Sequence, residues 1–319
     1  MRQRVIPAVV ATLLMFSASA SHAALLELAL IIDGSSSISG PRGNESGPDW
    51  GLQIGAYQNI FQNDFFTNIV SKGPYDQVAV AAYVFSSVAG SVPISDQDDN
   101  VLETVTFDIV VTSFLDWTVL NNDQEAADFG VLFGTLPQPG GKTNTSEAIN
   151  IATSGGTAGC PGSEMFPQIN PILDFCNVEE GEVAGILNNG IDGDALVIDI
   201  STDGEPTEPN SDGLDVDPTS PENILDRQLA YDEADAARAA GVTVNAIGVG
   251  DVDPDFLATL VAGDPDGFFV TAENFAEFET TLEDKLEVEL GLAIIPIPGA
   301  LPLFLSALGG LAFWRRRTT

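Results

Sequence analysis

The sequence predicts an α/β protein with a doubly wound, mostly parallel sheet, helices on both faces and one antiparallel edge strand. The first reason is that apolar strand-like segments alternate with amphipathic helix-like segments along the chain. The second is the run Leu25–Ile32, in which only Glu27 is charged, as expected for a central strand buried on both faces. The third is that polar residues directly follow two such apolar runs, where sheets of this kind bind ligands.

The predicted elements follow in order. After the first strand comes a helix over residues 50–69, because apolar side chains recur there at helical spacing. Residues 76–87 are a strand, and 104–114 and 117–120 are strand-like and antiparallel to their neighbours. The helix-forming residues of the first amphipathic face are Trp50, Ile54, Tyr57, Phe61 and Phe65.

The second half continues the alternation. Helices are expected over 123–136, 144–153, 227–240, 253–262 and from 275 to about 290, and strands over 195–202, 242–250 and 267–272. Gly241 ends the helix over 227–240. The final helix places Phe275, Phe278, Leu282, Leu286 and Leu290 on one face.

The two ends of the chain differ from its body. Residues 1–23 carry Arg2 and Arg4, an apolar run and the small-residue pattern Ser21-His22-Ala23, which together predict a secretory signal peptide. Residues 293–319 contain an apolar stretch from Ile297 to Trp314 followed by three arginines, which predicts a membrane segment with the body on the non-cytoplasmic side. The motif "IPIPGALP" in this tail resembles the PEP-CTERM class of bacterial sorting signals in its VPLPA variant.

That resemblance implies a tail recognised by an exosortase in the inner membrane. The protein is then expected in the periplasm, at the cell surface or in the extracellular matrix of a Gram-negative bacterium, anchored at least transiently by its C-terminal segment.

The charge and the scarce residue types exclude several functions. The chain has 47 acidic and 11 basic residues, and all the acidic ones lie between the two terminal segments, so binding of nucleic acid is not expected. The single histidine, His22, lies in the signal peptide, which leaves no imidazole for a Ser-His-Asp or Cys-His mechanism. Cys160 and Cys176 are the only cysteines, and in an oxidising compartment they are expected to form a disulfide.

Three short motifs stand where predicted strands or loops end. The first is "DGSSS" with Asp33, Ser35 and Ser37, the second is "GGKTN" with Thr143, and the third is "STDG" with Asp203. If the strands are parallel neighbours, two carboxylates and three hydroxyls converge at one sheet edge. Such an all-oxygen set suits a hard cation, Mg²⁺ above all and otherwise Mn²⁺ or Ca²⁺. Ser36 is expected to point away, since residues two apart in an extended segment share a direction.

In this order and context, the three motifs resemble the metal-ion-dependent adhesion site (MIDAS) of von Willebrand factor A (VWA) domains. The resemblance covers about residues 25–290, so that 24–292 is read as one VWA domain with insertions near 155–192 and 204–222. It implies that the metal ligands are Asp33, Ser35, Ser37, Thr143 and Asp203, and that one coordination position is left for an acidic group of a protein partner.

The same residues also allow other interpretations, and the sequence disfavours the first two. A phosphate loop at "GGKT" would need glycine where Leu136 stands, and a G-x-S-x-G nucleophile would need glycine at Ile38. Strand-end residues that only cap helices and turns, and a second cation site in either of two acidic loops, are further alternatives. Those loops contain Asp96, Asp98 and Asp99, and Asp212, Asp215 and Asp217.

The function expected from the sequence is therefore non-enzymatic adhesion through a bound divalent cation, at the cell surface or in an exopolysaccharide matrix. The alternatives are a secreted hydrolase that uses the same carboxylates, and a structural matrix protein in which the cation only braces loops. The two insertions flank the strand 195–202 and are candidate specificity loops.

Overall fold

A computed structural model describes residues 23–39, 48–95, 101–158, 181–204 and 221–292. The predicted signal peptide, the predicted sorting tail, both cysteines and both acidic loops named above lie outside these residues. Within the described ranges, no helix combines the length and apolar character needed to cross a membrane. The predicted C-terminal span and the disulfide therefore remain predictions.

The core of the fold is a six-stranded sheet with the strand order β3-β2-β1-β6-β7-β8. β1 pairs in parallel with β2 and β6, β6 with β7 and β7 with β8, whereas β3 pairs antiparallel with β2 at the edge. This confirms the doubly wound, mostly parallel sheet with one antiparallel edge strand. The strands are β1 Leu25–Asp33, β2 Gln77–Ser95, β3 Val101–Leu120, β6 Ala195–Thr202, β7 Thr243–Val249 and β8 Phe269–Ala272.

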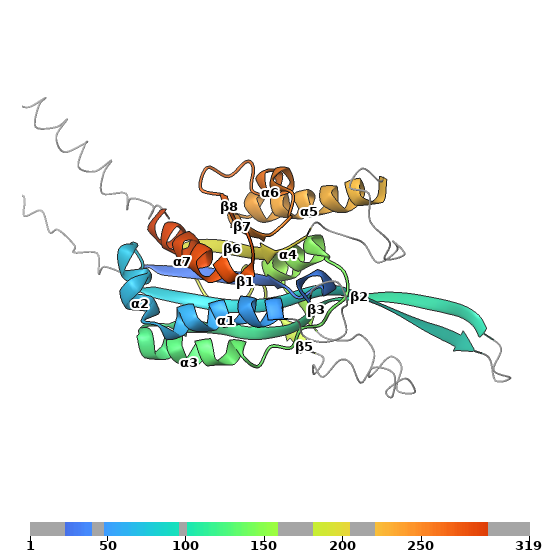
Figure 1. Ribbon diagram of the computed structural model, residues 1–319, viewed down its shortest axis with the longest axis horizontal. Helices are drawn as coiled ribbons and strands as arrows, with labels where there is room; N and C mark the ends of the chain where they lie inside the picture. Colours follow the sequence, from blue (N-terminus) through green and yellow to red (C-terminus); the bar gives the residue numbers. More distant parts are fainter. Residues whose placement is uncertain (1–22, 40–47, 96–100, 159–180, 205–220, 293–319) are drawn as a thin grey trace, which may run out of the picture.

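Helices cover both faces of this sheet, as the alternating pattern requires (Figure 1). One core joins α1, α3 and α7 to one side of β1 and β2, and a second core joins α4, α5 and α6 to the other side. The helices are α1 Pro48–Gln62, α2 Phe65–Asn68, α3 Asp123–Phe133, α4 Thr145–Ser154, α5 Pro221–Ala239, α6 Pro254–Leu260 and α7 Phe275–Leu292, with 3-10 turns η1 Ser36–Ser39 and η2 Val70–Lys72.

Two elements differ from the sequence prediction. The helix expected over 50–69 is broken in two, because Asp64 adopts a left-handed backbone conformation with φ 55° between α1 and α2. The break changes the direction of the chain while Phe65 stays in the same aromatic core and stacks on Phe61 with ring centroids 4.6 Å apart. Residues 104–114 and 117–120 belong to the single strand β3, which with β2 forms a ribbon that extends past the rest of the sheet (Figure 1).

The apolar periodicity of the last helix is confirmed. Phe278, Leu282, Leu286 and Leu290 are fully buried in α7, and Phe275 packs against the same core. Gly241 follows α5 with φ 91°, the left-handed conformation expected after a helix end.

The two insertions occupy different places in the fold. The described ends of the first form β4 Gly156–Ala158 and β5 Gly181–Val183, an antiparallel pair. The chain then runs over the sheet, where Tyr83 and Trp117 donate hydrogen bonds to the carbonyl of Ala184 at 2.7 and 2.9 Å. The second insertion begins directly at the end of β6. Of the two, only the second starts at the carboxyl ends of the strands.

Candidate functional site

The strand order reverses between β1 and β6, and the predicted site lies at the carboxyl ends of these two strands. In doubly wound sheets such a reversal leaves a crevice for ligands. Asp33 is the last residue of β1, and Asp203 directly follows β6. The site therefore forms because the neighbouring parallel strands β1 and β6 each carry a motif at their carboxyl end, and these two ends lie side by side.

A chain of hydrogen bonds joins four of the five predicted ligands. The Asp33 carboxylate accepts from the backbone N–H of Ser35 at 2.8 Å. The hydroxyls of Ser35 and Ser37 are 2.8 Å apart, and Ser37 donates to Asp203 Oδ1 at 2.6 Å. The four residues are thus linked in series, each to the next, by contacts of 2.6 to 2.8 Å.

Thr143 completes the group from the loop before α4. A Cβ built on Gly204 would lie 3.8 Å from Thr143 Oγ1 and 3.9 Å from Ser37 Oγ, so both hydroxyls border the same small space. Thr143 is buried, with 4% of its surface exposed, and α4 begins two residues later. The structure therefore brings together all five residues that the sequence singled out.

The loop that carries Thr143 is held against the first motif by backbone contacts. Gly140 N–H donates to the carbonyl of Gly34 at 3.0 Å, and Ser36 N–H donates to the carbonyl of Gly141 at 2.9 Å. The Ser36 hydroxyl accepts from Gly141 N–H at 2.8 Å. Ser36 therefore faces the glycine loop and not the carboxylates, as expected, and it positions Thr143 through that loop.

Gly34 is needed for this close approach. A Cβ at this position would lie 2.5 Å from Pro139 Cδ and 2.9 Å from Val84 Cγ1, both far inside contact distance. Gly34 also donates its N–H to the carbonyl of Phe85 at 2.8 Å, which fixes it against the neighbouring strand.

Substitution of Gly34 by alanine is therefore expected to lower the free energy of unfolding by about 1–3 kcal/mol, because the added methyl overpacks the loop. Gly51 on α1 is the matched control, since no atom lies within 4 Å of its would-be Cβ. Gly51→Ala should be neutral or stabilising because alanine favours the helix. Urea unfolding of the three proteins measures both effects, and equal stability of Gly34→Ala and wild type would contradict the steric argument.

Two residues outside the predicted set support the first motif, one at Asp33 and one at Ser35. Thr202 Oγ1 lies 2.6 Å from Asp33 Oδ2 and donates to it, and Gln138 Nε2 donates to the carbonyl of Ser35 at 3.1 Å. Sequence reasoning missed both. The position of Thr202 beside Asp203 in "STDG" was a usable signal, whereas nothing in the sequence connects Gln138 to Ser35.

The site has a buried floor and an exposed rim. Asp33 and Ser35 are buried, with 0% and 1% of their surface exposed, whereas Ser37 is exposed and Asp203 is half-buried. Among the described residues of the site, Ser37 and Asp203 form the side that a ligand can approach.

Burial raises the pKa of both carboxyl groups. Burial, and then the charge of Asp203, raise the pKa of Asp33 to about 7, while hydrogen bonds from Thr202 and Ser35 oppose the rise. Burial, followed by the charge of Asp49, raises the pKa of Asp203 to about 6. Among the described residues, the groups that lower these two pKa values are hydroxyl and amide donors. Two adjacent carboxylates held in this way, with three hydroxyls, fit a hard divalent cation well.

These pKa values predict a specific pH dependence in the absence of a cation. Between about pH 4 and pH 7 the folded protein binds more protons at Asp33 and Asp203 than the unfolded chain does, so its stability falls as the pH rises. Mg²⁺ should remove most of this fall, because it favours the ionised carboxylates. Melting temperatures measured across this range with chelator and with Mg²⁺ test the prediction, and coincident curves would count against it.

No protein-family profile matches this chain, and no curated protein matches it. Solved structures similar to it include VWA domains. Proximal thread matrix protein 1 from the mussel byssus has 16% identity over 84% of this chain and 47% of its own, with a TM-score of 0.43. A von Willebrand factor type A structure from Catenulispora acidiphila has 13% identity over 84% and 43%, with a TM-score of 0.39.

A third similar structure is the manganese-loaded TRAP protein of Plasmodium vivax, with 12% identity over 82% of this chain and 73% of its own and a TM-score of 0.38. The mussel protein is also known with a zinc-occupied MIDAS motif. This chain spans about half the length of the mussel protein. The strand order and register of this chain by themselves define its fold.

Proposed function

We propose that this chain is an exported, non-catalytic binding protein of VWA type that holds an acidic group of a protein partner through a divalent cation. Asp33, Ser35, Ser37, Thr143 and Asp203 would hold the cation, Mg²⁺ in the first place. Bound there, the ion would offer positive charge and an open coordination position to a carboxylate. The proposed setting is the periplasm, the cell surface or an exopolysaccharide matrix, with the tail processed by an exosortase.

The observation that carries this proposal is a pair of adjacent carboxylates, one of them fully buried. Within the described part of the chain, the hydrogen bonds to Asp33 come from a hydroxyl and a backbone amide. Burying a charge without a counter-charge is costly, and a bound cation removes that cost. The exposed rim at Ser37 and Asp203 leaves the ion accessible to a partner from one side.

The test is capture of partners from surface extracts of the source cells on the immobilised protein. With Mg²⁺, wild type is expected to retain proteins that a chelator releases, and an acidic peptide should compete for them better than its amidated form. Asp203→Asn should retain none of them, whereas Asp284→Asn, an exposed change on α7, should behave as wild type. Capture that persists in chelator, or that Asp203→Asn leaves unchanged, would refute the proposal.

A further inference from the structure

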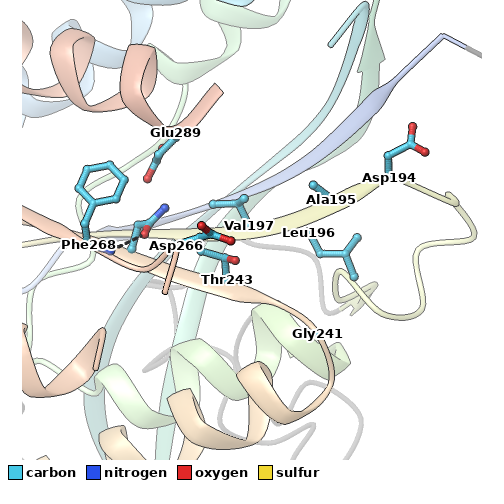
Figure 2. A pocket seen from close by; sticks show the side chains of 10 residues that line it. Asp194, Ala195, Leu196, Val197, Gly241, Thr243, Asp266, Phe268 and Glu289 are labelled. Carbon is cyan, nitrogen blue, oxygen red and sulfur yellow. Dashed lines mark hydrogen bonds between the residues drawn. The ribbon is translucent and has the colours of Figure 1, made fainter. Parts of the chain in front are cut away.

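A second candidate site lies at the opposite edge of the sheet. A cavity of about 180 Å³ opens where β6 and β7 begin, between these strands and the end of α7. β6 has 8 residues, so this edge is about 26 Å from the candidate cation site. Figure 2 shows Glu289 reaching from α7 toward the strands, and Asp194 at the start of β6.

The base of the cavity holds a buried acid with an unused oxygen. Glu289 is only 4% exposed, and it pairs with Lys285, which also contacts Asp199 Oδ1 at 2.6 Å. Glu289 Oε2 makes no hydrogen bond of ordinary geometry, although the Asn245 side chain is near enough to favour the ionised form of the carboxyl. An unsatisfied buried oxygen of this kind favours any ligand that donates a hydrogen bond to it.

The charged side chains that line the cavity are acidic. Asp194 and Asp266 line its exposed part, while Lys285 is held behind it by two carboxylates. Burial, and then the charge of Asp199, raise the pKa of Glu289 to about 8. A cation placed beside Glu289 would relieve both effects, whereas an anion would face Glu289, Asp194 and Asp266, with Lys285 already paired to two carboxylates.

The shape and the walls favour an organic cation over a metal ion. In the described ranges, no three acidic, histidine or cysteine side chains come close enough together to hold a metal, so this cavity does not present a ligand set of that kind. Val197 and Phe268 supply apolar walls between them. A cavity of roughly 150 Å³ accommodates benzene, which sets the scale of the ligand.

We propose that this cavity binds a small organic ammonium ion, whose charged group pairs with Glu289 and whose hydrocarbon part lies against Val197 and Phe268. The ammonium group donates to the unused oxygen Glu289 Oε2, and the carboxylates at the mouth attract the ligand. The site is independent of the cation at the other edge of the sheet.

The test uses benzylamine, which carries an ammonium group at pH 7, and benzyl alcohol, its neutral counterpart, in titration calorimetry with the full chain. Wild type is expected to bind benzylamine saturably and benzyl alcohol at least about tenfold more weakly. Glu289→Gln keeps the shape of the side chain but cannot ionise when the ammonium group binds, and it should weaken benzylamine binding about tenfold or more.

Thr243→Leu gives a second variant that leaves the buried ion pairs intact, and it should abolish binding by filling the cavity. Glu283→Gln, on the exposed side of α7, is the control and should bind as wild type does. Three results would each overturn the proposal: no saturable binding to wild type, equal binding to Thr243→Leu or Glu289→Gln, or equal affinity for the alcohol.

Discussion

Asp33→Asn is expected to lower the affinity for Mg²⁺ by about 100-fold or more, as measured by titration calorimetry. The substitution removes one of two carboxylates from the candidate cation site while it keeps the volume and the acceptor for Ser35 N–H. The positive ion then has only Asp203 to balance it. Asp284→Asn is the matched control and should leave the affinity unchanged, because its side chain is exposed on α7.

A failure to fold can be told apart from a loss of the site. Because burial raises the pKa of Asp33 to about 7, ionised Asp33 is unfavourable in the cation-free protein. Cation-free Asp33→Asn should therefore be at least as stable as cation-free wild type at neutral pH, and less stable only when Mg²⁺ is present. Equal affinity of mutant and wild type for Mg²⁺ would show that the ion binds elsewhere or not at all.

The second large effect concerns the buried charges behind α7. Lys285→Ala is expected to lower the free energy of unfolding by about 3–5 kcal/mol, because it leaves two carboxylates buried without their counter-charge. Lys285 has 1% of its surface exposed, and its Nζ contacts both Asp199 and Glu289. Urea unfolding at neutral pH measures the loss.

The exposed pair Lys72–Glu287 provides the comparison. The Lys72 side chain is 50% exposed, so Lys72→Ala should cost at most about 1 kcal/mol. If Lys285→Ala cost no more than that, the buried cluster would have no structural role. Replacing all three buried residues with apolar ones of similar size should be far less harmful than removing the lysine alone, because no unpaired charge remains.

Most of the fold was predictable because its signals are local. The apolar run of β1, the periodicity of α7 and the glycine after α5 each depend on residues near in sequence, and the structure confirms them. The broken helix at Asp64 was not predictable, because the apolar pattern continues across the break and the direction of the chain changes only to fit the core. The sequence predicts two separate strand-like pieces where the structure has the single strand β3. The two pieces form one strand because both pair with β2.

The candidate site was predictable to a similar degree. "DGSSS", "GGKTN" and "STDG" named the five side chains, since each motif places an oxygen directly after a strand or before a helix. The sequence does not show which hydroxyl group positions which loop. Thr202 and Gln138 support residues far away in the sequence, at contacts that exist only once β1 and β6 are neighbours.

The sequence by itself determined the alternation of strands and helices, the chemistry of the oxygen cluster and the strongly acidic balance of the body. Only the tertiary structure decided that Lys285 and Glu289 are buried, because α7 lies over β6, where Asp199 faces the same interior. From the sequence, charged residues on a helix are expected to be solvated, although Lys285 and Glu289 each stand three positions after a leucine of the buried face. They became a buried cluster, and the wall of a cavity, because burial depends on what packs against the helix and not on the helix itself.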